Sequence, residues 1–172
     1  MITGNVLPRP VAVFGSLGYT LPMFRIFVER KKGFQNEAEN ILHDITGFLG
    51  IGGVKSLRFI NRYDVENVEP ALIQKAARGV FSEPQSDVLF FDELPLAEDE
   101  TLIAWEYLPG QYDQRADSAE QCLSLLTDAK PAVRCAKLIA VSGKLSDEDL
   151  RRIKKYLINP VDSREAAAEL PK

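Results

Sequence analysis

One order of expected elements occurs twice along the 172-residue chain. Segments that alternate apolar and polar residues predict strands, and segments whose apolar residues recur three and four positions apart predict helices. We therefore expect a strand, a helix, a second strand and a second helix in each stretch. The strands are expected at 24–30, 54–63, 101–108 and 133–141, with a further strand at 87–91, and the helices begin near Asn36, Pro70, Ala116 and Ser146.

The two stretches can be superimposed with one offset. Glu29 and Glu106 lie 77 positions apart, and so do Gly33 and Gly110. A unit of this size cannot cover its own sheet, so we expect two copies to pack against each other. The prediction is an α/β (α+β) fold in which duplicated β-α-β-α units form a pseudo-dimer, with an antiparallel or mixed sheet and the helices packed on one face. A chance similarity of two strand-helix units is the alternative.

The expected domain leaves the beginning of the chain outside the fold. Residues 1–21 are apolar and include Pro8, Pro10, Gly15 and Gly18, without the cationic start and unbroken apolar run of a secretory signal. We interpret them as a leader or extension of the domain. A disordered segment is one form that such an extension can take. The folded domain is expected at 22–158, with its two units at about 22–80 and 86–158.

Composition argues against two classes of partner. The chain has 45% hydrophobic and 27% charged residues, which is typical of a folded domain. A net charge of −4 provides no broad positive field for a nucleic acid. No apolar stretch approaches the roughly 20 residues that cross a bilayer. We therefore expect a soluble, cytoplasmic protein with neither nucleic acid nor membrane as its partner.

Few residues of this chain are suited to catalysis. His43 is the only histidine, and Cys122 and Cys135 are the only cysteines. We expect both thiols to be reduced and largely buried, because two cysteines without a secretory leader do not make a disulfide framework. The sequence also lacks a phosphate-binding GxxxxGK[ST] loop. We therefore predict no catalytic, cofactor-binding or metal-binding residue in this chain.

A polar loop is expected to lead into the helix near Ala116. An aspartate here is favoured by the free backbone N–H groups at a helix N-terminus, and the arginine can pair with a carboxylate. The same side chains could instead face a partner domain or a bound anion. The candidate contact residues are Gln111, Asp113, Gln114, Arg115 and Asp117.

A second polar group lies at the end of the expected strand at 54–63. Asn61, Arg62 and Asp64 surround Tyr63 just before the helix that begins at Pro70. Asn and Asp side chains commonly hydrogen-bond their own backbone in a turn, so a turn is one interpretation. A contact with a partner domain is the other, and Asn61, Arg62 and Asp64 are its candidate residues.

Four segments follow one another along the chain: NRYD at 61–64, FSEPQSD at 81–87, LPGQYDQRADSAEQC at 108–122 and YLINPVDSREA at 156–166. Together they resemble the beginning of phosphoribosylformylglycinamidine synthase (formylglycinamide ribonucleotide amidotransferase) of the large, single-chain type. The resemblance covers residues 24–172 and does not include the leader.

The resemblance implies a fold and a role. In that family, an N-terminal domain similar to a dimer of the small PurS subunit precedes a linker, a synthetase domain that uses ATP and magnesium, and a glutaminase domain. The whole enzyme is a glutamine- and ATP-dependent amidoligase of de novo purine biosynthesis. By this resemblance, residues 22–158 are the PurS-like domain and residues 159–172 begin the linker. The catalytic groups of the family would then lie beyond Lys172.

We therefore expect a docking and organising domain that supports glutaminase–synthetase assembly and ammonia transfer without being catalytic itself. Its partners would be the synthetase and glutaminase domains of the same enzyme. The alternative is a small-molecule-binding regulatory domain, because paired βαβ units can bind ligands between their sheets. An enzyme with its own active site is the third interpretation. Stabilisation by a metabolite or by the partner domains would separate the first two.

Overall fold

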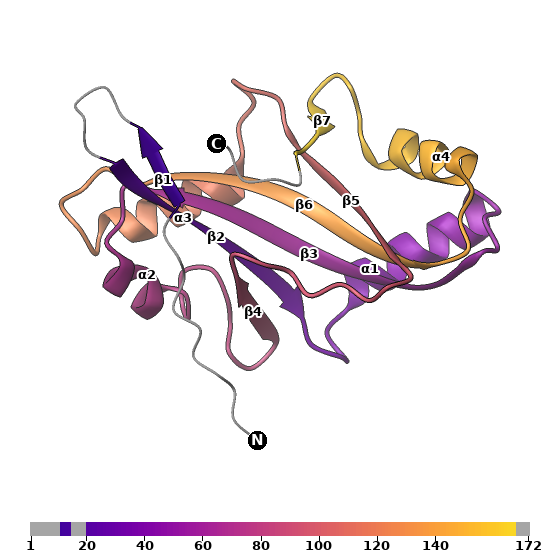
Figure 1. Ribbon diagram of the computed structural model, residues 1–172, viewed down its shortest axis with the longest axis horizontal. Helices are drawn as coiled ribbons and strands as arrows, with labels where there is room; N and C mark the ends of the chain where they lie inside the picture. The colour runs from indigo at the N-terminus through magenta and orange to yellow at the C-terminus, as the bar shows by residue number, and fades with distance from the viewer. Residues whose placement is uncertain (1–10, 15–19, 168–172) are drawn as a thin grey trace.

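The computed structural model describes residues 11–14 and 20–167, and within them seven strands and four α-helices (Figure 1). The strands are β1 (Val11–Phe14), β2 (Thr20–Arg30), β3 (Val54–Glu66), β4 (Asp87–Phe91), β5 (Glu100–Tyr107), β6 (Ala132–Gly143) and β7 (Ser163–Glu165). The helices are α1 (Asn36–His43), α2 (Pro70–Ala76), α3 (Gln114–Ser124) and α4 (Asp147–Leu157), and a π-helical turn, η1 (Asp44–Phe48), continues α1. None of these helices is long and apolar enough to cross a membrane.

The described strands form one antiparallel sheet. Six of them follow one another in the order β1-β2-β3-β6-β5-β7, and β4 pairs with β2 beside this path. The two central strands, β3 and β6, are paired from Val54↔Gly143 to Glu66↔Ala132, and they run through the middle of Figure 1. The protein is therefore a mixed α+β fold, and its sheet is antiparallel.

The strand registers on the two sides of the sheet centre correspond. Val28 of β2 pairs with Asn61 of β3, and Trp105 of β5, 77 positions after Val28, pairs with Lys137 of β6. Lys137 lies 76 positions after Asn61, and these two residues pair with each other in the central ladder. The outer strands β4 and β7 correspond in the same way. Val28 also pairs with Leu89, and Trp105 also pairs with Glu165, which lies 76 positions after Leu89.

The two halves also share the turn between their first strand and first helix. Gly33 and Gly110 both have positive φ angles, 92° and 89°. This backbone conformation is unfavourable for residues with a Cβ atom, so glycine is the residue that makes the turn without strain. The 77 positions between these two glycines are the same as those between Glu29 and Glu106.

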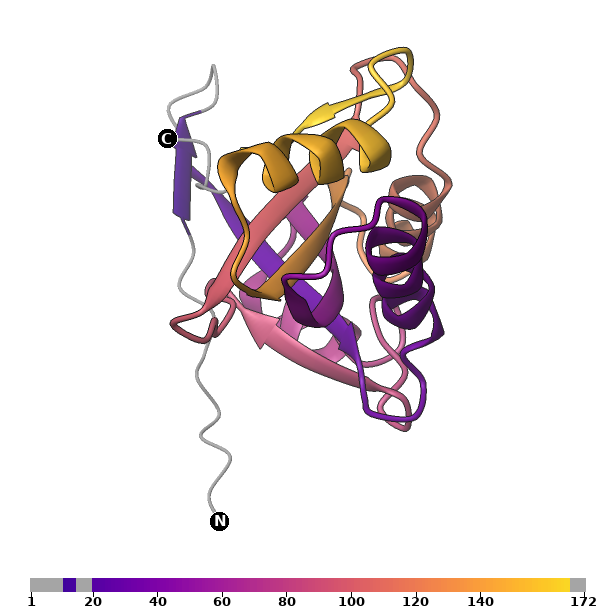
Figure 2. The same cartoon turned by 90° about the vertical axis from the view of Figure 1, so that its right-hand side faces the viewer.

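The helices pack on one face of the sheet (Figure 2). Alternate residues of a strand point to the same face, and Leu57, Phe59, Tyr63 and Val65 share this face of β3. Tyr63 and Val65 belong to a cluster that joins β2 and β3 to α2 and α3, through Ile73 and Leu123 among others. Leu57 and Phe59 belong to a second cluster, which joins the sheet to α1, η1 and α4.

The opposite face of the sheet carries no described helix. Its apolar centre consists of Phe27, Ile60, Ala104, Leu138 and Ala140, all of them buried. Ala166, which follows β7, is part of the same cluster. This face therefore has a smaller apolar core of its own.

Several segments differ from the sequence-based expectation. Asn61–Asp64 lie inside β3 and not in a turn, because pairing with β6 continues the strand to Glu66. Asp87–Phe91 pair with β2, which places this strand beside the first half of the chain. Short strands also occupy Val11–Phe14, in the expected leader, and Ser163–Glu165, in the expected linker. Residues 1–10, 15–19 and 168–172 of those two segments lie outside the described residues.

Candidate functional site

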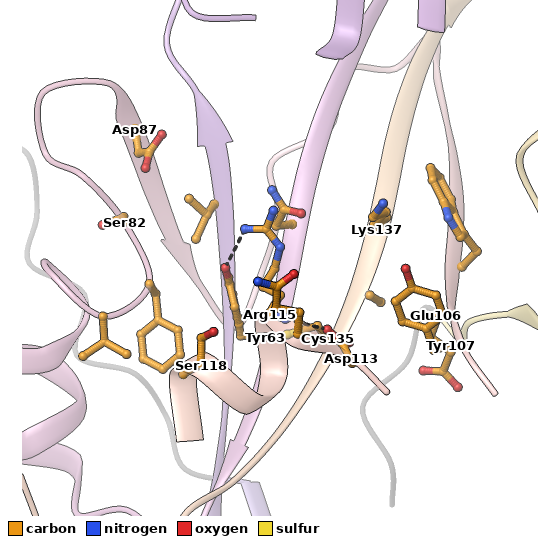
Figure 3. Close-up of a pocket in the computed structure, with 18 of the residues that line it drawn as sticks. Tyr63, Ser82, Asp87, Glu106, Tyr107, Asp113, Arg115, Ser118, Cys135 and Lys137 are labelled. Carbon is orange, nitrogen blue, oxygen red and sulfur yellow. Dashed lines mark hydrogen bonds between the residues drawn. The ribbon is translucent and has the colours of Figure 1, made fainter. Parts of the chain in front are cut away.

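A cavity of about 720 Å³ opens on the helix-bearing face, near the centre of the sheet (Figure 3). Its floor is formed by strand residues, among them Asn61, Tyr63, Trp105 and Lys137. One wall is the beginning of α3, and the others are the loop at 79–83 and the segment that follows α4. The cavity thus lies where the two halves of the chain meet.

The polar loop before α3 is organised by two aspartates. Asp113 is the N-cap of the helix, and its Oδ1 accepts hydrogen bonds from the backbone N–H groups of Arg115 at 2.9 Å and Ala116 at 3.1 Å. Asp117 accepts hydrogen bonds from Tyr112 at 3.0 Å and Gln121 at 2.8 Å. Both aspartates therefore have a structural role, as one of the two interpretations expected.

Arg115 reaches from α3 over the cavity toward β3. Its Nη1 donates a hydrogen bond to the Tyr63 hydroxyl at 3.1 Å, and the two side chains point toward one another (Figure 3). Burial raises the pKa of the Tyr63 phenol, and the positive charge of Arg115 opposes that shift. Arg115 forms no ion pair with any carboxylate in the described part of the chain. The rest of its guanidinium is therefore available for another acceptor.

Two polar residues at the floor of the cavity have no partner. The side chains of Asn61 and Lys137 make no hydrogen bond or ion pair within residues 20–167. The Oδ1 atom of Asn61 is nevertheless buried. Gln114, at the start of α3, also lines the cavity and is exposed.

The carboxylates around the cavity mostly have partners already. Asp87 forms an ion pair with Arg30 at 3.0 Å, and Glu106 forms one with Arg164 at 2.7 Å. Asp113 accepts hydrogen bonds from the backbone N–H groups of Arg115 and Ala116. The positive charges of Arg115 and Lys137 are therefore not neutralised by these neighbours.

Arg62 and Asp64 lie on the opposite face of the sheet. Asp64 is buried and accepts two hydrogen bonds from Arg25, at 2.6 and 2.9 Å. Arg62 is also buried, lies 3.4 Å from Asp64 and donates to the backbone oxygen of Ala167 at 2.6 Å. Burial lowers the pKa of the Arg62 guanidinium, and the Asp64 carboxylate opposes that shift. These residues form an internal ionic cluster on the face away from the cavity.

The candidate residues are thus divided between the two faces. Asn61, Asp113, Gln114 and Arg115 meet around the cavity. Asp117 lies in the first turn of α3 but does not line the cavity, and Gln111 is exposed in the preceding turn.

Sequence reasoning missed Lys137, although a signal was present. Lys137 interrupts an inward-facing row of β6 that otherwise consists of Val133, Cys135, Ile139 and Val141. Lysine is rarely found among the buried residues of a strand, so a lysine within an apolar row indicates that this position has a role other than packing.

The cysteines do not form a reactive pair. Cys122 is exposed on α3, which corrects the expectation that both thiols are largely buried, while Cys135 is partly buried on β6. Burial raises the pKa of the Cys135 thiol, so it remains protonated at neutral pH. His43 is exposed, and no group of three His, Cys, Asp or Glu residues within the described ranges could hold a metal ion.

No protein-family model, no curated protein and no solved structure matches this chain in the three comparisons made with known proteins.

Proposed function

We propose that this chain is the N-terminal, PurS-like domain of a large-type phosphoribosylformylglycinamidine synthase. It organises the synthetase and glutaminase domains of this cytoplasmic ligase of purine biosynthesis and supports ammonia transfer between them. The chain itself is not catalytic, and ATP and magnesium belong to the remainder of the enzyme. The proposal rests first on the four ordered segments that resemble this family.

The observation that carries the proposal is the correspondence of the strand registers. Val28 pairs with Asn61 as Trp105 pairs with Lys137, and the central Asn61↔Lys137 pair joins equivalent positions of the two halves. Two copies of one subunit that pair through their longest strands would have this symmetry. This supports a duplicated unit, folded as a pseudo-dimer within one chain.

A docking role is supported by the surface next to the polar loop. Tyr107, Tyr112 and Val161 are exposed to 43%, 71% and 77%. Tyr107 ends β5, Tyr112 lies in the turn that follows it, and Val161 lies in the turn after α4; a backbone hydrogen bond of 2.8 Å from Leu108 to Asp162 joins these segments. Exposed aromatic and apolar side chains beside a polar loop are typical of protein interfaces. We call Tyr107, Tyr112 and Val161 the docking surface.

The test is the affinity of the 172-residue chain for the separately expressed synthetase and glutaminase domains. We expect Tyr112→Ala to weaken this association at least about tenfold, because aromatic side chains dominate interface energies. Leu125→Ala is the matched control, since Leu125 is 86% exposed at the other end of α3 and should leave the affinity unchanged. No measurable association of the unaltered chain, or equal losses in both variants, would refute the docking role.

A further inference from the structure

The centre of the sheet contains a polar pair where packing alone would place apolar residues. On the helix-bearing face, the row of β3 is Leu57, Phe59, Asn61, Tyr63 and Val65. The facing row of β6 has Lys137 at its centre, and Lys137 pairs directly with Asn61. The two polar residues are therefore neighbours in the middle of an otherwise largely apolar surface.

This polar pair is not satisfied within the described part of the protein. Neither side chain has a hydrogen-bond or ion-pair partner there, and the Oδ1 atom of Asn61 is buried. A buried polar group without a partner is destabilising, so such a position is usually apolar or linked to another polar group. The pair faces a cavity of about 720 Å³, within the range of small-molecule sites.

Arg115 adds a second positive charge to the same cavity. Among the described residues, its guanidinium donates a hydrogen bond only to the Tyr63 hydroxyl, at 3.1 Å, and forms no ion pair. The lining carboxylates Asp87, Glu106 and Asp113 already have basic or backbone partners. The charged groups left over are the cations Lys137 and Arg115 and one carboxylate, Asp162, beside the amides of Asn61 and Gln114.

We propose that this cavity binds a small metabolite that carries an oxyanion, phosphate or carboxylate, next to a hydroxyl or amino group. Lys137 and Arg115 bind the oxyanion, and the Asn61 oxygen accepts a hydrogen bond from the neighbouring donor. Trp105 and Val28, which line the cavity beside Lys137 and Asn61, contact the apolar part of the molecule. The site does not depend on the docking role proposed above.

Calorimetric titration of the full chain with inorganic phosphate and with glycerol 3-phosphate tests the proposal. We expect both compounds to bind at low ionic strength, and glycerol 3-phosphate to bind more tightly because it also supplies hydroxyl donors. Lys137→Gln should weaken both at least about tenfold, as expected for loss of a charge-assisted hydrogen bond. Arg115→Lys should also weaken both, because lysine cannot offer two parallel donors.

Two variants control for charge and for folding. Lys155→Gln removes a positive charge from the exposed side of α4 and should leave both affinities unchanged. Asp162→Asn removes a lining carboxylate that has no side-chain partner among the described residues, and it should strengthen binding. Thermal melting of each variant, which should match that of the unaltered chain, shows whether the fold is retained.

The possible results are distinct. Binding that Lys137→Gln abolishes and Lys155→Gln preserves supports the oxyanion site. If neither compound binds, the proposal is overturned. It is also overturned if Lys137→Gln and Lys155→Gln weaken the binding equally. Equal affinities for phosphate and glycerol 3-phosphate overturn the role assigned to Asn61. None of these results depends on the synthetase or glutaminase domains, so they are separate from the test of docking.

Discussion

Arg115 lies at the contact between α3 and the central sheet. Its hydrogen bond to Tyr63 joins α3 to the central sheet. We expect Arg115→Ala to lower the free energy of unfolding by only about 1 kcal/mol, because the arginine is exposed and donates to a neutral hydroxyl. Urea unfolding measures this value, and Tyr63→Phe is its counterpart in a double-mutant cycle. A loss of several kcal/mol would show that Arg115 is mainly structural.

The two cysteines should differ sharply in reactivity. Cys122 is exposed, whereas burial keeps the pKa of the Cys135 thiol above its ordinary value. Because the thiolate is the reactive form, iodoacetamide at neutral pH should modify Cys122 and leave Cys135 largely unmodified. Peptide mass spectrometry after brief labelling measures both sites, and Cys122→Ser is the control. Faster labelling of Cys135 would contradict the burial described here.

At the scale of elements, the close approach of β3 and β6 depends on glycine. Gly143, at the end of β6, has a φ of 144°, and a Cβ atom there would lie 2.1 Å from the backbone oxygen of Gly53. We expect Gly143→Ala to destabilise the domain by about 3 kcal/mol, since both backbone strain and the clash must be relieved.

Gly52→Ala is the matched control for this prediction. No neighbouring atom lies within 4 Å of a Cβ placed at Gly52, and its φ is not in the positive region. The change should alter the free energy of unfolding by less than about 0.5 kcal/mol, as for most surface substitutions. Denaturant unfolding of both variants gives the comparison. Equal changes in the free energy of unfolding for Gly143→Ala and Gly52→Ala would show that the end of β6 can move away from Gly53 without destabilising the domain.

At the scale of the whole molecule, each half of the chain is an incomplete sheet. Truncation after Leu94 keeps β1 to β4 but removes β6, so the whole ladder from Val54 to Glu66 loses its partner. A long unpaired edge with an uncovered apolar face favours association or unfolding. We expect this fragment, and a shorter one ending at Gly79, to self-associate or to lack cooperative unfolding in ultracentrifugation and urea titration. A stable, monomeric first half would contradict the proposed pseudo-dimer.

The proposed role predicts that the 172-residue chain is inactive by itself. Its only histidine is exposed, Cys135 is protonated at neutral pH, and the described residues offer no metal-binding group. We expect neither ATP hydrolysis nor release of ammonia from glutamine by the pure protein. Sensitive assays of phosphate and ammonia test this, with the synthetase and glutaminase domains as the positive control. Either activity in the isolated chain would refute the non-catalytic role.

Local pattern was sufficient to predict most elements of this fold. The expected strand at 101–108 corresponds to β5 at Glu100–Tyr107, and the expected strand at 133–141 lies within β6. The alternation of apolar residues in a strand and the glycine turns at Gly33 and Gly110 are properties of neighbouring residues. They can therefore be recognised without knowing what the segments pack against.

Only the tertiary structure decided which polar residues meet. Asn61 and Arg62 are adjacent in the sequence, yet they lie on opposite faces of β3, one at the cavity and the other in the ionic cluster with Asp64. The residue opposite Asn61 on the neighbouring strand is Lys137, 76 positions away. Strand register depends on the packing of both faces at once, and a shift by one residue would exchange them. That long-range choice, which no local pattern contains, created the cavity.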